Sequence, residues 1–160
     1  MDIAIYPGSF NPITLGHLNI LERALGIFSE VTLLVAINPN KEPLFSQEES
    51  MEMISEAISG LPGAKVDFHN GLTVDYAQEH GISTAVRGLR AVTDFEHEFS
   101  MALTNRSLWP NFDTVFLMTK AEYMYLSSLV VRQVSQMGGN VAQFVPPCVE
   151  RRLREKFGHA

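Results

Sequence analysis

The sequence has only one cysteine, Cys148, and no long apolar run. A single cysteine cannot form an internal disulfide or a cysteine-based metal site, so packing is its expected role. No apolar stretch reaches the roughly 18 residues that a membrane-spanning helix needs. The first residues, MDIAIYPGSF, lack the basic segment and the small-residue cleavage site of a signal peptide. We therefore expect a cytoplasmic protein that does not enter a membrane.

Positive charge is also scarce, since 12 Lys and Arg residues stand against 18 Asp and Glu residues and the net charge is -6. This balance argues against broad binding to nucleic acid or to an anionic membrane, so any phosphate must be bound locally. Two phosphate-binding fingerprints, GxxxxGK[ST] and GxGxxG, are missing as well. Their absence disfavours a P-loop NTPase and a dinucleotide-binding Rossmann protein.

The chain does contain a regular alternation of strand-like and helix-like segments. Its 160 residues, 46% of them hydrophobic, suit a single domain spanning residues 1–160. Short β-branched or apolar runs predict five strands, over residues 2–6, 31–37, 64–68, 82–86 and 113–118. The alternation predicts an α/β, single-domain Rossmann-like fold, with a five-stranded parallel sheet and helices on both of its faces.

Helical patterns fill the gaps between these runs. The first helix is expected to bury four apolar residues, Leu18, Leu21, Leu25 and Phe28. The second begins at Ser46, and Glu49 three residues later predicts a capping box. Further helices are expected over residues 73–79, 93–108, 128–137 and 148–157.

The residues that follow the predicted strands indicate an anion site. In open parallel sheets, ligands bind beyond the carboxyl ends of the strands. Glycines, hydroxyls and cations collect there: Gly8 and Ser9 follow the first strand, Lys41 the second, and Arg87 and Arg90 the fourth. Glycine lets a phosphate approach the backbone, and Lys or Arg supplies full charge.

Gly16 and His17 stand where the first helix begins. Backbone N–H groups at a helix N-terminus can hold phosphate oxygens, and an imidazole there can reach a phosphoryl centre. A histidine at a helix start is also compatible with a purely structural role. The local pattern alone leaves both interpretations of His17 open.

Three sequence blocks carry a resemblance to a known family. TLGH, residues 14–17, resembles the (H/T)xGH motif of the nucleotidyltransferase α/β-phosphodiesterase superfamily. The longer YPGSFNPITLGH, residues 6–17, resembles the start of the bacterial phosphopantetheine adenylyltransferases. RGLRAVTDFEHE, residues 87–98, and YMYLSS, residues 123–128, resemble the RGLR and (I/V)SS(S/T) segments of that family. With Lys41 in the expected place, the resemblance covers essentially the whole chain.

The resemblance implies transfer of the adenylyl group of ATP to 4'-phosphopantetheine, giving dephospho-coenzyme A and pyrophosphate, a step of coenzyme A biosynthesis. The nucleophile is itself a phosphate whose second pKa is about 6, so no general base is required. Catalysis then rests on in-line positioning and on donors where charge develops. The resemblance assigns transition-state stabilisation to His17, the phosphopantetheine phosphate to Lys41, ATP phosphates to Arg90 and contact with the incoming phosphate to Ser9.

The same resemblance implies the composition of two binding sites. The ATP site comprises Ser9, Phe10, His17, Gly88, Leu89, Arg90, Glu98, Tyr123, Met124, Tyr125, Leu126, Ser127, Ser128 and Leu129. The phosphopantetheine site comprises Ser9, Lys41, Leu72, Thr73 and Arg87. No side chain is expected to ligate a metal, because Mg²⁺ binds chiefly through ATP phosphates and water. Coenzyme A is implied as a feedback inhibitor and a homohexamer as the assembly, with neither nucleic acid nor membrane as a partner.

Each assignment has a plainer alternative. Ser127 and Ser128 suit helix N-caps, Glu98 suits a solvated helix face, and Arg87 and Arg90 suit surface ion pairs. The chain also departs from the family pattern at four positions, Asn11 in place of Asp, Leu15 in place of Asn, His97 in place of Tyr and Leu129 in place of a hydroxyl residue. Two other functions stay open: another nucleotidyltransferase of the superfamily, using CTP with an alcohol phosphate or ATP with nicotinate mononucleotide, and a non-catalytic nucleotide-binding protein.

Overall fold

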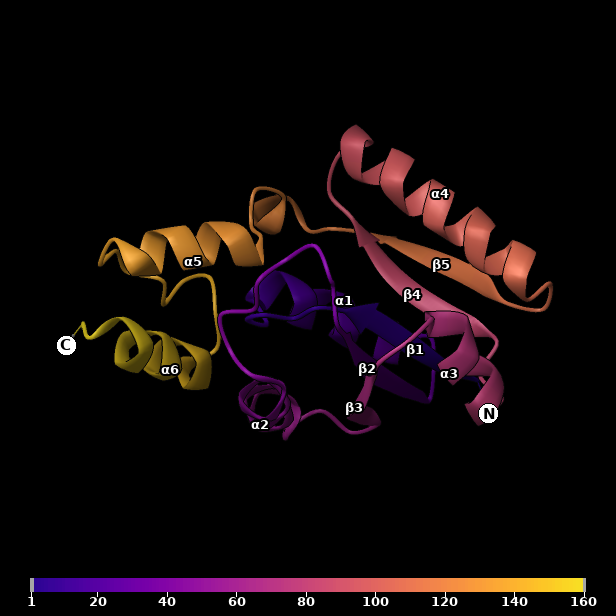
Figure 1. Ribbon diagram of the computed structural model, residues 1–160, viewed down its shortest axis with the longest axis horizontal. Coiled ribbons are helices and arrows are strands. Elements are labelled where there is room, and N and C mark those ends of the chain that lie inside the picture. The colour runs from indigo at the N-terminus through magenta and orange to yellow at the C-terminus, as the bar shows by residue number, and fades with distance from the viewer. Residues whose placement is uncertain (1, 160) are drawn as a thin grey trace.

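The computed structural model describes residues 2–159, which form a five-stranded parallel sheet (Figure 1). The strands are β1 (Ile3–Gly8), β2 (Glu30–Ala36), β3 (Ala64–His69), β4 (Thr84–Leu89) and β5 (Asp113–Met118). Their order across the sheet is β3-β2-β1-β4-β5, and each neighbouring pair is parallel. The predicted fold class and all five predicted strands are confirmed.

The predicted and observed strand boundaries differ most at β4. β4 begins at Thr84 rather than at Ile82 and continues to Leu89. Ile82 donates its backbone N–H to Ala77 of the preceding helix and packs against the apolar cluster beneath that helix. Ile82 therefore belongs to the helix-to-strand turn, and its apolar character reflects core packing.

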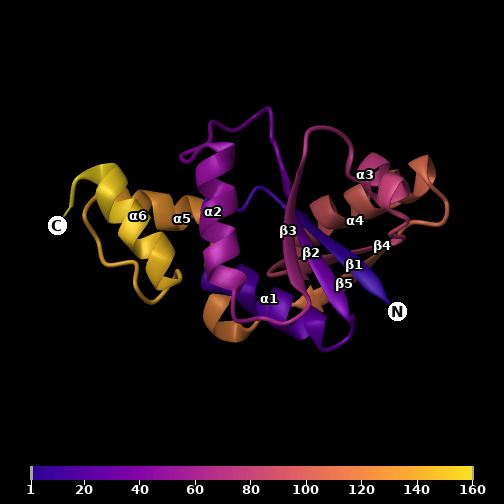
Figure 2. The same cartoon turned by 90° about the horizontal axis from the view of Figure 1, so that it is seen from below.

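Helices cover both faces of the sheet, as predicted. They are α1 (Leu15–Leu25), α2 (Gln47–Ile58), α3 (Thr73–His80), α4 (Val92–Leu108), α5 (Ser128–Gln136) and α6 (Pro147–Phe157), with a short 3-10 turn, η1, at Ala121–Tyr123. Figure 2 shows α1 and α2 on one side of the sheet, with α3 and α4 on the other. No helix among residues 2–159 is both long and apolar enough to cross a membrane.

The side chains of the central strands alternate between two cores. On β2, Val31, Leu33 and Val35 face the larger cluster under α1, α2, α5 and α6, whereas Leu34 faces the smaller cluster under α3. Successive strand residues point to opposite faces, so a strand buried on both faces is apolar throughout. This is why β2 carries apolar residues toward both faces, with only the buried Thr32 interrupting the run from Val31 to Ala36.

The helix ends follow from the local sequence. The backbone N–H of Glu49 donates to Ser46 Oγ over 3.1 Å, and the Ser46 N–H donates to Glu49 Oε2 over 2.8 Å, so the predicted capping box is present. The first helix is shorter than its predicted apolar face, because α1 ends at Leu25 and Gly26 caps it. Phe28 is buried beyond that end rather than within the helix.

α6 packs against α2 at the end of the molecule farthest from β5 (Figure 1). Its Cys148 is buried, with Sγ 3.8 Å from the carbonyl oxygen of Met53 in α2. Arg151 and Arg152 form ion pairs with Glu56 and Glu52 of α2. The C-terminal helix therefore closes the larger core.

Candidate active site

A cavity of about 570 Å³ lies at the carboxyl ends of β1 and β4. The strand order reverses at this point, because β2 and β3 extend from one side of β1 while β4 and β5 extend from the other. Loops leaving β1 and β4 therefore diverge and leave a crevice, which is where open α/β sheets bind ligands. Its volume lies within the range of small-molecule sites.

Most of the predicted site residues line this one cavity. They are Ser9, Phe10, His17, Lys41, Thr73, Arg87, Gly88, Arg90, Glu98, Tyr123, Leu126, Ser127, Ser128 and Leu129. Four predicted residues are not in its lining. Leu89 is buried, whereas Leu72, Met124 and Tyr125 are exposed beside it.

His17 is oriented by the cap of its own helix. Thr14 is the N-cap of α1, and its Oγ1 accepts the backbone N–H of His17 over 3.4 Å. The backbone N–H of Thr14 in turn donates to His17 Nδ1 over 3.0 Å. Because Nδ1 is the acceptor, the proton of the neutral ring lies on Nε2. This capping role is structural, and it leaves Nε2–H as the donor available to a ligand.

The environment of His17 keeps its ring uncharged. Burial, followed by the positive charges of Arg87 and Arg90, lowers the pKa of His17 from 6.5 to about 3. The ring also packs edge-on against Phe10, with their centroids 5.0 Å apart. Phe10 itself has φ of 43°, a left-handed conformation that is uncommon for an aromatic residue. That conformation turns the buried Phe10 ring toward His17 at the cavity wall.

Arg87 is held by Glu98 of α4. Arg87 Nε donates to Glu98 Oε2 over 2.8 Å, Nη2 donates to the other carboxylate oxygen, and Nη1 donates to the carbonyl of Pro7. Burial alone would lower the pKa of Arg87, but the hydrogen bonds and charge of Glu98 raise it. Glu98 is only 7% exposed, so it is not a solvated face of α4. A contact between Glu98 and nucleotide remains a prediction.

Arg90 links the end of β4 to the segment before α5. Its Nε and Nη2 donate to Asp94 over 2.9 and 3.3 Å, and its Nη1 donates to the carbonyl of Leu126 over 2.7 Å. Lys41 differs from both arginines, because it is exposed and makes no ion pair within residues 2–159. Positive charge at the cavity is therefore partly neutralised at Arg87 and Arg90, and uncompensated at Lys41.

The N-terminus of α5 forms another wall. Ser127 is its N-cap, with Oγ accepting the N–H of Val130 over 3.2 Å, and Ser128 Oγ donates to the carbonyl of Pro12 over 2.8 Å. Ser127 thus has the N-cap role that the sequence left open, whereas Ser128 is not a cap and ties the start of α5 to the loop after β1. Leu129 is 62% exposed and lines the cavity, so it does not pack into the core. The first N–H groups of α5 remain suited to an anion.

Four residues of α4 line the cavity but were not identified as site residues from the sequence. They are Asp94, His97, Met101 and Asn105. Spacings of three and four residues place them with Glu98 along one side of the helix. That periodicity was the available signal, but it could not show whether the stripe faced the cavity or solvent.

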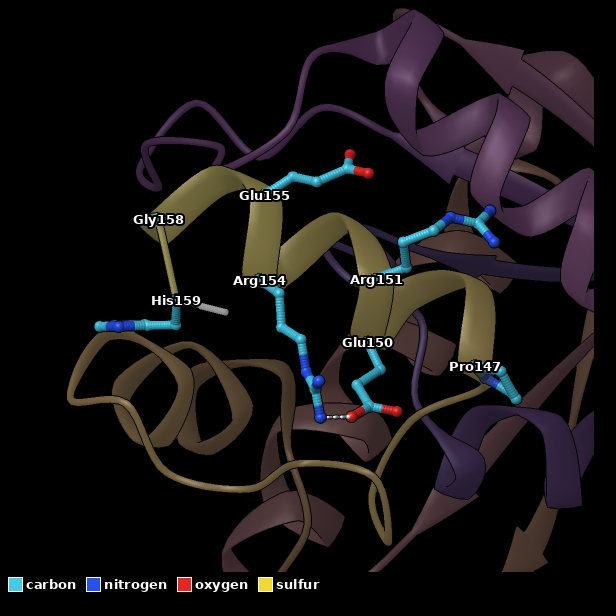
Figure 3. Close-up of a pocket in the computed structure, with 7 residues that line it drawn as sticks. All are labelled: Pro147, Glu150, Arg151, Arg154, Glu155, Gly158 and His159. Carbon is cyan, nitrogen blue, oxygen red and sulfur yellow. Dashed lines mark hydrogen bonds and ion pairs between the residues drawn. The ribbon is translucent and has the colours of Figure 1, made fainter.

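A second hollow lies along α6, far from the carboxyl ends of β1 and β4 (Figures 1 and 3). Figure 3 shows its charged side chains spreading in different directions, with Arg154 paired to Glu150. These side chains do not converge on a common point. Within the described part of the chain, no group of three or more His, Cys, Asp or Glu residues is arranged to hold a metal ion.

Comparison with known proteins agrees with this arrangement. Residues 5–134 match the family described as cytidylyltransferase-like. A phosphopantetheine adenylyltransferase from Desulforudis audaxviator is 52% identical over 158 residues, which is 99% of this chain and 97% of that protein.

Two solved structures share the fold at low sequence identity. A putative nicotinate-nucleotide adenylyltransferase from Vibrio parahaemolyticus has a TM-score of 0.73 at 20% identity, covering 96% of this chain and 99% of that one. A bifunctional NMN adenylyltransferase/ADP ribose pyrophosphatase from Francisella tularensis has a TM-score of 0.70 at 17% identity over 96% of this chain, which spans 48% of that protein. The fold, the cavity and the near-full-length match together show that the chain belongs to the phosphopantetheine adenylyltransferase family, within the cytidylyltransferase-like proteins.

Proposed function

We propose that the chain transfers the adenylyl group of ATP to 4'-phosphopantetheine, producing dephospho-coenzyme A and pyrophosphate. The observation that carries this proposal is the neutral His17, a donor through Nε2, in one cavity with Lys41, Arg87 and Arg90. The name and near-full-length similarity of the Desulforudis relative support the same substrates and disfavour the alternative nucleotidyltransferases.

The chemistry requires two anions to meet. The phosphopantetheine phosphate is largely dianionic near neutral pH and attacks the α-phosphorus of ATP without a general base. His17 is a poor base because of its low pKa, so it donates Nε2–H to an α-phosphate oxygen as negative charge develops there. The uncompensated ammonium of Lys41 holds the attacking phosphate and screens its repulsion from ATP.

Arg90 is placed to hold the triphosphate. Of the five N–H groups of an arginine, three are used for Asp94 and Leu126, and two are left for a ligand. Its orientation is therefore set before ATP binds, which reduces the entropy lost on binding. The N–H groups at the start of α5 add donors for the same phosphates.

We propose that magnesium enters with ATP. The acidic residues of the cavity, Asp94 and Glu98, are each engaged by an arginine. These pairs leave no carboxylate cage, so phosphate oxygens and water would hold the ion. When bound, the ion neutralises charge on the departing pyrophosphate.

We propose further that copies of this chain assemble through α4, with six subunits as the resemblance implies. Phe95, Phe99, Leu103 and Leu108 of α4 are 46 to 55% exposed. Exposed apolar side chains gathered on one element mark interaction surfaces. Phe112, which follows α4 in the sequence, is by contrast 1% exposed and belongs to the core.

We propose that the protein is cytoplasmic. We also propose that coenzyme A inhibits it by competing with phosphopantetheine for this cavity.

The decisive experiment measures pyrophosphate release from ATP, Mg²⁺ and 4'-phosphopantetheine, with each component omitted in turn. Parallel reactions replace ATP by CTP, or phosphopantetheine by nicotinate mononucleotide. We expect release only with the complete first mixture, together with stoichiometric dephospho-coenzyme A. Release only with CTP or nicotinate mononucleotide, or binding of ATP without any release, would overturn the proposal. Added coenzyme A should inhibit less as phosphopantetheine is raised.

A further inference from the structure

Arg132 of α5 joins two loops of the candidate active site without lining its cavity. Its Nε donates to the carbonyl of Asn11 over 2.7 Å, and its Nη2 donates to Asn11 Oδ1 over 3.0 Å. Its Nη1 donates to the carbonyl of Glu42 over 3.0 Å. All three nitrogens of the guanidinium are engaged, and one of the bonded residues directly follows Lys41.

Asn11 completes this junction. It is buried, and its Oδ1 also accepts the backbone N–H groups of Leu44 and Phe45 over 3.0 and 3.1 Å. Its Nδ2 donates to the carbonyl of Phe45 over 2.9 Å and to Ser50 Oγ over 3.2 Å. Arg132 and Asn11 therefore fix residues 42–45 to the loop that follows β1.

Lys41 lies between this junction and a tight turn. The Lys41 N–H donates to the carbonyl of Asn38 over 3.1 Å, and the Asn40 N–H donates to Asn38 Oδ1 over 3.0 Å. The Lys41 side chain is exposed and has no ion pair within residues 2–159 to hold it. The position of its ammonium group therefore depends on the backbone of residues 38–42, and the Glu42 contact to Arg132 is one of the bonds that set this backbone.

The contacts explain why an arginine stands at this position. All three acceptors are uncharged oxygens, two on Asn11 and one on Glu42. Burial lowers the pKa of Arg132, but a guanidinium remains charged under all ordinary conditions. Its planar fork reaches acceptors on two loops at once, whereas a lysine has a single nitrogen. A phosphate-binding role fits poorly, because Arg132 does not line the cavity, whereas Arg90 does.

We infer that Arg132 is a positioning residue, which holds Lys41 where it meets the attacking phosphate by fixing Glu42 and Asn11. The inference rests on the proposed function, since it depends on the role given there to Lys41. The same guanidinium ties α5, which contributes donors for the triphosphate, to the loop that carries Lys41.

Two substitutions test this role. Arg132→Met keeps a long apolar stem without donors, and Arg132→Lys keeps the charge without the fork. Both should lower kcat/KM for phosphopantetheine by about 10- to 100-fold, because small misplacements of a catalytic group are costly. ATP affinity, measured by calorimetry, should stay within about twofold of the wild type. Arg151→Met is the matched control, since Arg151 is exposed on α6 and pairs with Glu56, and it should change neither value.

A double-mutant cycle asks whether Arg132 acts through Lys41. If it does, the double variant Lys41→Ala with Arg132→Met should have the same kcat/KM for phosphopantetheine as Lys41→Ala alone, within about twofold. Losses that multiply in the double variant would overturn the inference. So would an ATP affinity that falls as much as kcat/KM, because Arg132 would then bind the triphosphate itself.

Hydrogen exchange separates the positioning role from the proposed reaction. Without any substrate, the backbone amides of Leu44 and Phe45 should exchange faster in Arg132→Met than in the wild type. In Arg151→Met their exchange rates should equal those of the wild type. A lower melting temperature with normal kcat/KM in the folded variant would show a merely structural residue and overturn the inference, as would unchanged exchange. A wild type that releases no pyrophosphate from ATP and phosphopantetheine would overturn the proposed function, and with it the role of Arg132 in that reaction.

Discussion

His17 has a structural task in the cap of α1, and the proposed function gives the same side chain a chemical one. Its Nδ1 accepts the Thr14 N–H in the cap of α1, and this bond fixes both the ring orientation and the tautomer. Burial and the nearby arginines keep the ring neutral. The residue is therefore prepared as a hydrogen-bond donor before substrate arrives, which is the condition under which electrostatic stabilisation is most effective.

Replacing His17 should affect the transition state more than substrate binding. If Nε2–H donates mainly to charge that develops during the reaction, His17→Ala should lower kcat and kcat/KM together by about 10²-fold or more, with both KM values nearly unchanged. Steady-state kinetics with each substrate varied in turn measures this. His159→Ala, at an exposed position near the C-terminus, is the control and should behave as the wild type. A variant of His17 with raised KM and normal kcat would contradict the assigned role.

The same histidine should make the fold sensitive to acid. Its pKa is about 3 in the folded chain and 6.5 when unperturbed, so the unfolded chain takes up this proton first as pH falls. The unfolding free energy should therefore decrease between pH 6.5 and pH 3, by at most about 1.4 kcal/mol per pH unit from this residue. Denaturant titrations of the wild type and His17→Gln at pH 7 and pH 5 measure the difference. Equal losses of unfolding free energy in the two proteins would show that His17 titrates normally and would contradict the prediction. As an independent check, NMR of the wild type should find the His17 ring neutral at pH 5.

At the scale of elements, the end of β4 and the start of α5 supply most of the charge recognition. Arg87 lies near the end of β4 and Arg90 directly follows it, and α4 returns along the cavity with an acidic partner for each arginine. α5 begins beside them and contributes backbone donors rather than side-chain charge. Each element therefore supplies a different kind of donor to one crevice.

Arg87 and Arg90 should divide the substrates between them. Arg87→Ala should weaken phosphopantetheine binding more than ATP binding, and Arg90→Ala should do the reverse. Calorimetry with each ligand measures both effects. Arg87→Ala should also lower the melting temperature more, because it leaves the buried Glu98 without its partner, whereas Asp94 is more exposed. Equal losses of both ligands in both variants would mean that the arginines only stabilise the loop.

The start of α5 offers a gain-of-affinity test. Leu129 lines the cavity and is 62% exposed, so Leu129→Ser removes no core packing. A hydroxyl at this position should tighten ATP binding by about 0.5 to 1.5 kcal/mol, or roughly 2- to 13-fold, the usual net value of one hydrogen bond. ATP affinity and melting temperature are measured on the same variant, and the latter should hardly change. Unchanged or weaker binding would show that backbone groups of α5 alone hold the phosphates there.

At the scale of the whole molecule, the two sides of the sheet differ in how well they are covered. α1, α2, α5 and α6 enclose the larger core, whereas α4 has only Glu98 buried among its residues from Asp94 to Leu108. An amphipathic helix normally buries its apolar residues. On α4 these residues are exposed, which is expected when a second copy of the chain covers them.

Disrupting the outer face of α4 should therefore change the assembly. Phe99→Glu places a charge on a phenylalanine that is 49% exposed, and it should convert the assembly to a smaller species. Light scattering coupled to size-exclusion chromatography measures the mass. Met137→Glu is the control, because Met137 is 88% exposed at the end of α5 and should tolerate the charge. A wild type that is already monomeric at micromolar concentration would rule out the proposed hexamer.

The fold was predictable from the sequence, and most of the predicted site residues do line the cavity. Largely apolar runs such as that of β2, which only Thr32 interrupts between Val31 and Ala36, indicate buried parallel strands, and alternation with helices leaves few topologies. In a parallel sheet the carboxyl ends of all strands lie at the same edge. The residues that follow β1, β2, β3 and β4 were therefore expected to converge. A local signal also sufficed for the capping box of α2, whose partners are three residues apart, whereas the similar box of Thr14 and His17 was not predicted.

Only the tertiary structure decided how these residues act. Whether Glu98 faces solvent or Arg87, whether Leu129 faces the core or the cavity, and what Arg132 contacts depend on pairs 11 to 121 residues apart or on the packing of whole elements. The low pKa of His17 has the same origin, since it results from burial and from charges on β4 that the sequence around His17 does not contain. Periodicity and capping are short-range properties that a sequence displays directly. Burial and long-range pairing exist only after the chain has folded, and these determine the chemistry of the site.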